Sequence, residues 1–161
     1  MTDRLAPFQF VLSSGSRTTL DRIPDHAART LSNVLHHFGK PGWSSITIQP
    51  MPDGSTFVRD DGPPPPMLQA AGTAEAMTIE WGRFDSRGVW QVSVLGRGDA
   101  RPSEPTKTIS WNDGAGSSRV FEDEVFDADE ATDVFLQFVR ALEPPSTYAL
   151  RELDLSSKSP S

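Results

Sequence analysis

Two stretches of the chain repeat apolar residues at the spacing of one helix face. The first follows Asp21 and Pro24 and stops before Gly39. Aspartate can cap a helix, proline is tolerated in a first helical turn, and glycine is common just beyond a helix end. The apolar stripe of this segment consists of Ala27, Leu31, Val34, Leu35 and Phe38. The pattern predicts an amphipathic helix that buries this stripe.

The second stretch is the strongest amphipathic pattern of the chain, and it opens after an acidic turn. Asp127 or Asp129 is suited to the N-cap, and Asp127 with Glu130 resembles a capping box in which aspartate replaces the usual serine or threonine. The pair Pro144-Pro145 ends the helix. Its apolar stripe consists of Ala131, Val134, Phe135, Phe138, Val139 and Leu142.

Alternation of apolar and polar residues marks the predicted strands. They are residues 7–12, 44–49, 77–81, 90–94, 108–111, 119–124 and 148–151. Residues 82–88 have the length of a hairpin connection, so the strands on either side should pair antiparallel.

The remaining segments read as connections. Residues 13–19 predict a polar turn, and residues 50–66 predict an irregular stretch in which Pro63–Pro66 adopts polyproline II. Thr56–Val58 could add a short edge strand, and Met67–Ala71 is expected to form a single helical turn.

The order of these elements predicts an α+β fold. Consecutive antiparallel strands bury one face, so both helices should lie on that face. We therefore expect a two-layer sandwich: a mainly antiparallel sheet of about six to seven strands with two helices on one face. Residues 1–155 would form a single domain, and residues 156–161 a polar tail.

Charge and composition narrow the functional classes. The 161 residues carry a net charge of −7, which disfavours nucleic acid and anionic membrane surfaces as ligands and suits a basic protein partner. The chain has no cysteine, and its first residues lack a signal-peptide pattern, so a cytoplasmic protein is expected. The excess of arginine over lysine, with abundant alanine, glycine, proline and aspartate, is typical of a GC-rich genome such as that of an actinobacterium.

No motif of the sequence specifies catalysis, a metal or a cofactor. His26, His36 and His37 do not have the spacing of a chelating pair, and the aspartates near residue 127 lack the central glycine of a calcium loop. No G-x-S-x-G element is present. We therefore expect neither catalytic residues nor metal ligands nor a cofactor. The four tryptophans, which fit either the core or a sheet-edge binding anchor, are Trp43, Trp81, Trp90 and Trp111.

The acidic stretch before and within the second helix is the main candidate site. It holds seven carboxylates with no lysine or arginine among them, more than a helix dipole alone explains. Clustered carboxylates on a rigid helix start can steer a basic protein into contact. The expected partner-binding residues are Glu122, Asp123, Glu124, Asp127, Asp129 and Glu130.

Several stretches of the second half support a family resemblance. They are M-T-I-E-W (77–81), V-W-Q-V-S-V (89–94), V-F-E-D-E-V-F-D-A-D-E-A-T-D-V-F-L-Q-F-V (120–139) and Y-A-L-R-E-L (148–153). With the element order, they resemble small actinobacterial immunity proteins of polymorphic toxin systems, Imm1-like in particular. The chain departs from that family in its Pro63–Pro66 loop and in lacking a terminal tryptophan. The resemblance implies a cytoplasmic, non-catalytic inhibitor that binds one cognate toxin.

Two other classes stay open. The chain could be a structural or assembly subunit of a secretion or phage-type system, which an extended apolar interface would favour. It could also be a small hydrolase that uses the carboxylates, which a deep polar pocket with two perturbed carboxylates would favour.

Overall fold

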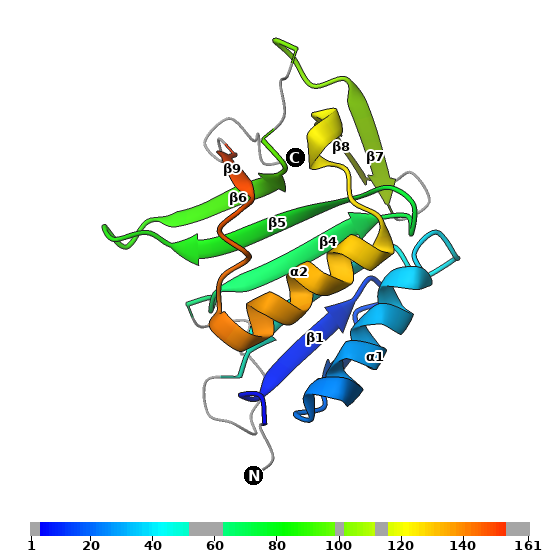
Figure 1. The fold of residues 1–161 in the computed structure, drawn as a ribbon, viewed down its shortest axis with the longest axis vertical. Helices are drawn as coiled ribbons and strands as arrows, with labels where there is room; N and C mark the ends of the chain where they lie inside the picture. Colours follow the sequence, from blue (N-terminus) through cyan, green and yellow to red (C-terminus); the bar gives the residue numbers. More distant parts are fainter. Residues whose placement is uncertain (1–3, 52–62, 99–101, 112–115, 154–161) are drawn as a thin grey trace.

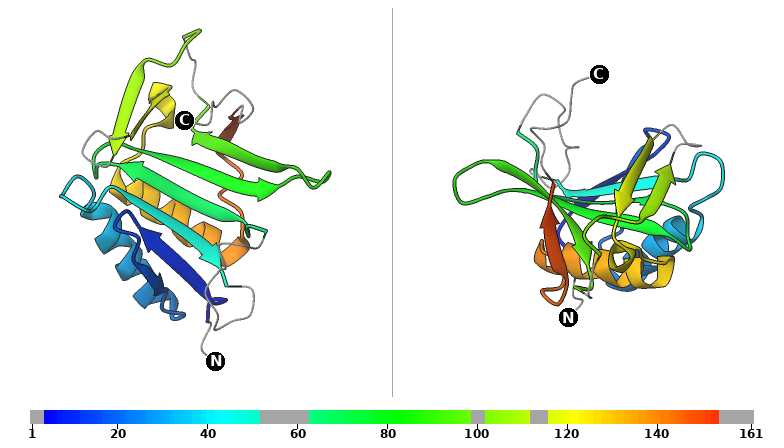
Figure 2. Two further views of the ribbon diagram at one scale, coloured as in Figure 1. Left: turned by 180° about the vertical axis from the view of Figure 1, so that it is seen from behind. Right: turned by 90° about the horizontal axis from the view of Figure 1, so that it is seen from above.

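The computed structural model describes residues 4–51, 63–98, 102–111 and 116–153, which form two layers (Figure 1). One layer is a seven-stranded sheet in which all neighbouring strands are antiparallel. The other layer consists of two α-helices that cover one face of the sheet, as the view from above shows (Figure 2). The predicted α+β sandwich is confirmed. The division of the chain into a domain of residues 1–155 and a tail of residues 156–161 stays a prediction.

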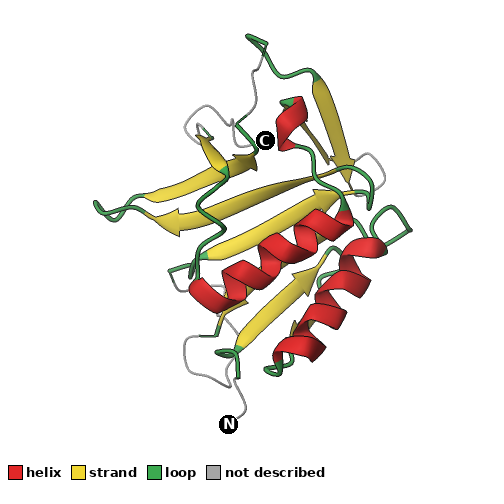
Figure 3. Cartoon of the chain, in the orientation of Figure 1, coloured by secondary structure: helices red, strands yellow, loops and turns green. Residues whose placement is uncertain are grey.

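The strand order of the large sheet is β2-β1-β3-β4-β5-β6-β9. The strands are β1 (Phe8–Leu12), β2 (Arg17–Thr19), β3 (Ser45–Pro50), β4 (Met67–Gly72), β5 (Met77–Phe84), β6 (Trp90–Gly96) and β9 (Ala149–Glu152). Within the described residues, strands β7 (Lys107–Trp111) and β8 (Gly116–Val120) pair only with each other, and a 3₁₀ helix, η1 (Glu122–Glu124), follows them. The helices are α1 (Pro24–His36) and α2 (Ala128–Ala141), which lie side by side in front of the sheet in Figure 3.

The core lies between the sheet and the helix layer. Phe10 and Ile48 face each other across β1 and β3 and are both buried, and the ring of Phe8 meets Phe138 of α2 edge to face with centroids 6.1 Å apart. The stripe predicted for the first helix is buried along its whole length. The stripe predicted for the second helix is buried except for Leu142, which is exposed. Hydrophobic burial thus fixes both helices against one sheet face.

The helix ends confirm one predicted cap and correct the other. The Asp127 side chain accepts a hydrogen bond from the Glu130 backbone nitrogen at 2.9 Å, so Asp127 is the N-cap of α2. The prediction that Asp21 caps α1 was wrong. The N-cap position belongs to Ile23, which gives no side-chain cap, and Asp21 instead accepts a hydrogen bond from the Ile23 nitrogen at 2.9 Å in the turn before the helix.

Three further local predictions were wrong or displaced. Met67–Ala71 is not a helical turn, because this segment is part of β4 and pairs with both β3 and β5. Residues 17–19, predicted as turn, form the exposed edge strand β2. The strand predicted over 119–124 lies earlier, and residues 122–124 form η1. Pro63–Pro66 has no helix or strand, and the possible strand Thr56–Val58 lies outside the described residues.

The β7–β8 hairpin meets the sheet where β4 ends. Gly72 has a φ of +135°, and a Cβ placed there would lie 2.9 Å from Cγ2 of Ile109. Ile109 is buried, so the missing side chain at position 72 lets β7 pack closely on the sheet. In the view from above, the hairpin rises on the side opposite the helices (Figure 2). We call the face of the sheet that the helices leave uncovered the open face. The β7–β8 hairpin forms a wall at one end of this face.

Candidate functional site

The acidic segment, residues 121–130, runs along the end of the sheet and into α2 (Figure 1). Phe126 anchors its middle. Its backbone nitrogen donates to the Met77 carbonyl at 2.8 Å, and its carbonyl accepts from the Met77 nitrogen at 2.9 Å. Because the Phe126 ring is also fully buried, the carboxylates on either side of it are held in place by the core.

Glu124 is an internal residue, not a surface one. It has 0% exposure, and both of its carboxylate oxygens accept hydrogen bonds from Arg151 of β9, at 2.8 and 2.9 Å. One oxygen also accepts from the Phe121 nitrogen at 2.9 Å. The hydrogen bond to Glu124 raises the pKa of Arg151, which keeps the guanidinium charged. Glu124 therefore ties η1 to the last strand of the sheet.

Asp123 is also buried, with 7% exposure. Its carboxylate accepts a hydrogen bond from the Gly98 nitrogen at 2.9 Å. Its backbone carbonyl accepts from the Arg97 nitrogen at 3.0 Å and from the Arg97 guanidinium at 3.3 Å. Asp123 thus fastens η1 to the residues that follow β6.

Arg97 and Tyr148 bind the side chain of Glu130. The Arg97 guanidinium donates to the Val125 carbonyl at 3.0 Å and forms a very short ion pair with one Glu130 oxygen. The Tyr148 hydroxyl donates to the other Glu130 oxygen at 2.8 Å. Burial, followed by this hydrogen bond, raises the pKa of Tyr148 to about 12. Glu130 is therefore half-buried and engaged on both oxygens.

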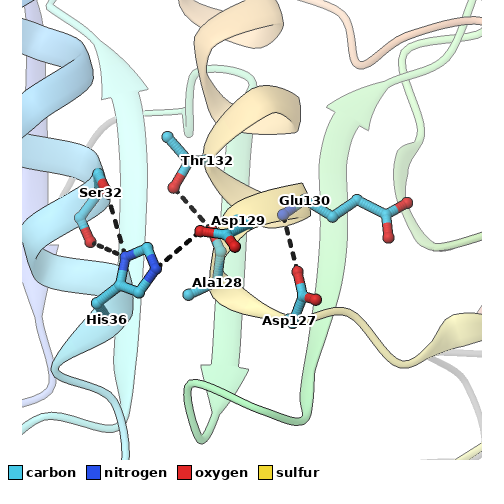
Figure 4. Close-up of polar contacts among 7 residues, drawn as sticks. All are labelled: Ser32, His36, Asp127, Ala128, Asp129, Glu130 and Thr132. Carbon is cyan, nitrogen blue, oxygen red and sulfur yellow. Dashed lines mark hydrogen bonds and ion pairs between the residues drawn. The ribbon is translucent and has the colours of Figure 1, made fainter.

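Asp129 projects from the first turn of α2 towards the end of α1 (Figure 4). Its carboxylate contacts Nε2 of His36 at 2.9 Å, while Nδ1 of His36 donates to the Ser32 carbonyl at 2.7 Å. Both ring nitrogens face an acceptor, so both contacts are hydrogen bonds only when the imidazole is protonated. The backbone contact with Ser32, and then the contact with Asp129, raises the pKa of His36.

The six predicted partner-binding residues therefore divide into two groups. Glu122, Asp127 and Asp129 are exposed, whereas Asp123, Glu124 and Glu130 are buried or half-buried and hold the segment to the sheet. Asp127 is exposed while capping α2, and Asp129 while contacting His36. We call the exposed group Glu122, Asp127 and Asp129 the acidic patch.

Sequence reasoning missed the residues that balance these carboxylates. Arg97, Arg151 and Tyr148 come from the ends of strands and from the loop before β9, 18 to 33 residues away from the carboxylates they bind. Nothing in their local spacing marks them. Only the pairing of β6 with β9 brings them to the acidic segment.

Within the described ranges, no group of three or more histidine, aspartate and glutamate side chains could hold a metal ion. His26 contacts Asp21 at 3.3 Å, and His37 donates to the Asn33 carbonyl at 2.5 Å, so the histidines serve different local contacts. No helix in the described part of the chain is long and apolar enough to cross a membrane. No protein-family profile matches the chain, and no curated protein matches it significantly.

Proposed function

We propose that this chain is a non-catalytic protein-binding module, an immunity protein that neutralises a cognate toxin through the acidic patch. The observation that carries the proposal is that the carboxylates of the acidic segment have two different roles. Asp123, Glu124 and Glu130 hold the segment in place, and Glu122, Asp127 and Asp129 remain exposed on it. A rigid, charged surface binds a basic partner without the entropy cost of ordering a loop.

Electrostatics favour the same type of partner. The whole chain carries a net charge of −7, and the acidic segment itself has no lysine or arginine. Surface charges act over about 10 Å at moderate salt, so the exposed carboxylates of this segment should accelerate encounter with a basic surface. Such an interaction should weaken as salt increases.

The supporting contacts also argue against acid/base catalysis by these carboxylates. Glu124 accepts hydrogen bonds from Arg151 and Phe121, and Glu130 from Arg97 and Tyr148. A catalytic carboxylate must reach a substrate proton, and these oxygens are already engaged inside the fold. The hydrolase alternative therefore has no support in this segment.

The experiment that tests the proposal is a rescue assay. The chain is co-expressed with the protein encoded immediately upstream, and growth is recorded. We expect the upstream protein to arrest growth alone and this chain to restore it. If the upstream protein is harmless, or growth is not restored, the immunity function is wrong and measurement of the oligomeric state should follow, to examine the assembly-subunit alternative.

The same assay tests the acidic patch with a matched pair of triple variants. Glu122→Gln, Asp127→Ser and Asp129→Asn together remove three charges, and serine keeps the N-cap at position 127. The control variant removes three exposed carboxylates away from the patch: Asp25→Asn, Glu104→Gln and Glu143→Gln. We expect loss of rescue and a weaker salt dependence of binding only in the first variant. Equal rescue by both variants would mean that the acidic patch is not the contact surface.

A further inference from the structure

The open face of the sheet carries a cavity of about 430 Å³ beside the β7–β8 hairpin. Residues of β3, β4 and β5 form its floor, and residues of the hairpin form its wall. The floor includes Ser45, Gln69 and Thr78, and the wall includes Trp111 and Ser118. The volume lies in the range of sites that take a small ligand. The cavity is separate from the acidic patch, whose residues do not line it.

Strand register brings the polar side chains of the floor together. Thr78 of β5 pairs with Ala71 of β4, and Ala71 pairs with Ser45 of β3. Residues paired across antiparallel strands lie on the same face of a sheet, so the three form one row. Ile79, the neighbour of Thr78, belongs to the core between the sheet and the helices, so this row lies on the open face. Gln69, two residues before Ala71, shares that face.

The hairpin places Trp111 and Ser118 on the side of the wall that faces this row. Both share a hairpin face with Ile109, which pairs with Ser118 and is buried where β7 packs on the sheet. Trp111 itself pairs with Gly116, and a Cβ placed at Gly116 would overlap the indole nitrogen. The absence of a side chain at position 116 therefore makes room for the indole beside the cavity.

One hydroxyl of the floor lacks a hydrogen bond within the described part of the chain. Thr78 is buried, and neither a donor nor an acceptor among the described residues reaches its Oγ1. Buried polar groups are nearly always hydrogen-bonded, because an unmade bond costs the desolvation of the group. An exception beside a cavity indicates a ligand that supplies the missing partner.

The neutral polar groups around the cavity match a ligand that carries several hydroxyl groups. A serine or threonine hydroxyl donates one hydrogen bond and accepts others, and a glutamine amide also does both. The hydroxyl groups of a sugar have the same double capacity, so they can pair with such side chains in either direction. Glu80 also lines the cavity, but this match rests on the neutral groups and holds whichever partner the Glu80 carboxylate takes.

Trp111 adds an apolar surface of the kind on which a sugar ring packs. A pyranose ring presents C–H groups on its faces and hydroxyl groups around its edge. C–H groups pack favourably against an aromatic ring, whereas inorganic phosphate would use the polar floor and gain nothing from the indole. The indole in the wall and the hydroxyl and amide groups in the floor thus correspond to the two kinds of surface that a sugar ring carries.

We infer that this cavity binds an uncharged sugar ring. Trp111 is the surface on which the ring packs, and Thr78 forms a hydrogen bond with one of the sugar hydroxyls. Gln69 and Ser118 contact the other hydroxyls from the floor and the wall. The inference goes beyond the proposed function, because it requires neither a toxin nor the acidic patch.

The first test titrates the full chain with probes that differ in their hydroxyl groups. The methyl glycosides of glucose, galactose, mannose and N-acetylglucosamine carry sugar hydroxyls, and tetrahydropyranylmethanol has the same ring size with a single hydroxyl. In two-dimensional NMR spectra, the Trp111 indole N–H signal is assigned with Trp111→Phe. We expect at least one glycoside to shift this signal and the amide signals of Thr78 and Ser118 saturably, and tetrahydropyranylmethanol to leave them in place.

Two charged probes complete this titration. Inorganic phosphate and N-acetyl-arginine amide should not shift these signals saturably. Saturable shifts with either charged probe and with none of the glycosides would mean that the cavity takes a charged ligand, and the inference would be wrong. The absence of saturable shifts with every glycoside, or equal shifts with tetrahydropyranylmethanol, would also overturn it.

Matched variants then test the individual groups with the glycoside that binds. Thr78→Val removes the hydroxyl with little change of shape and should weaken binding about tenfold, whereas Thr78→Ser keeps the hydroxyl and should retain most of the affinity. Ser118→Ala should weaken binding by a smaller factor. Ser110→Ala, at an exposed position of the same hairpin outside the cavity lining, should have no effect. Unchanged affinity in Thr78→Val would contradict the assigned site.

Thermal unfolding of the same variants separates loss of binding from loss of folding. Thr78→Val should unfold at a temperature no lower than the wild type, so its weaker binding would come from the missing hydroxyl. The titrations contain no toxin, so their failure would overturn the sugar site and leave the proposed function standing. Failure of the rescue assay would overturn the immunity function and leave the sugar site standing.

Discussion

Glu124 and Arg151 form an ion pair in which the carboxylate has no exposed surface and the guanidinium donates to both of its oxygens. The pair joins η1 to β9, the edge strand that closes one end of the sheet. Removing one member of a buried pair leaves the other without compensation, which costs more than the net value of the pair. The stability of the acidic segment should therefore depend on Arg151.

Substitution of either member should destabilise the fold. We expect Glu124→Gln and Arg151→Met each to lower the free energy of unfolding by about 2–4 kcal/mol, measured by urea denaturation. Glu122→Gln, two residues away and exposed, should change it by less than about 0.5 kcal/mol. The double variant Glu124→Leu/Arg151→Met should recover part of the loss, because neither charge is then buried alone. A loss equal to the sum of the single variants would show that the two residues act independently.

The helices were predictable from the sequence because their signals are local. The stripe from Ala27 to Phe38 and the cap at Asp127 are set by residues within a few positions of each other. Strand β4 was not predictable in the same way. Met, Leu, Gln and Ala are good helix formers, and only pairing with β3 and β5, which depends on distant residues, makes Met67–Gly72 a strand.

The candidate site shows the same limit. The carboxylates were visible as a cluster, but their exposure was not, since it depends on where the arginines lie in the fold. Register decides this: Arg151 pairs with Val94 in the β6–β9 ladder, which carries it to Glu124. The cavity on the open face, lined by residues of β3, β4, β5, β7 and β8, could not be predicted for a similar reason, because these strands are widely separated in the sequence.

Thr78 is 3% exposed, and its Oγ1 makes no hydrogen bond with any residue that the structure describes. This buried hydroxyl should reduce the stability of the protein. Valine has nearly the same shape and no hydroxyl, so Thr78→Val should raise the free energy of unfolding by about 1 kcal/mol. Thr73→Val is the matched control, because the Thr73 hydroxyl accepts from the Ala76 nitrogen at 3.2 Å, and its loss should lower stability. Both are measured by thermal and urea denaturation. A destabilising Thr78→Val would mean that the hydroxyl has a partner in solution.

Tyr148 should titrate at unusually high pH. It is the only tyrosine in the chain, so the near-ultraviolet absorbance of tyrosinate reports on it alone. We expect a midpoint near 12 in the folded protein, against about 10 in the unfolded chain. Because the folded-state pKa is the higher one, the stabilising contribution of Tyr148 is complete below the unfolded pKa and is lost as the pH rises from about 10 to about 12.

Glu130 contributes to this shift, but burial contributes more. Glu130→Gln should therefore lower the tyrosine midpoint and still leave it above the unfolded value. Asp133→Asn, whose charge has the weakest influence on Tyr148 among the named causes, should move it less. A larger effect of Asp133→Asn than of Glu130→Gln would contradict the hydrogen bond between Tyr148 and Glu130.

His36 should make stability depend on pH near neutrality. Its pKa is raised in the folded protein, because Ser32 and Asp129 both accept hydrogen bonds from its ring. The stabilising contribution is therefore complete below the unfolded pKa and disappears as the pH rises through the folded one. Because the side chains of His36 and Asp129 are exposed, this contribution to the free energy of unfolding should be about 0.5 kcal/mol or less. We expect the difference in unfolding free energy between wild type and His36→Gln to be positive in mildly acidic buffer and to shrink in mildly alkaline buffer.

Asp129→Asn separates the two contacts of this histidine. The Ser32 carbonyl is the larger cause of the raised pKa, so this variant should keep part of the pH dependence and lose the rest. The pKa of His36, followed by NMR of its ring protons, should fall on substitution of Asp129 and remain unchanged in Asp25→Asn, whose exposed carboxylate lies at the opposite end of α1. If Asp129→Asn leaves the pKa of His36 unchanged, the contact between the two helices does not form in solution, and α2 presents Asp129 to a partner without an internal competitor.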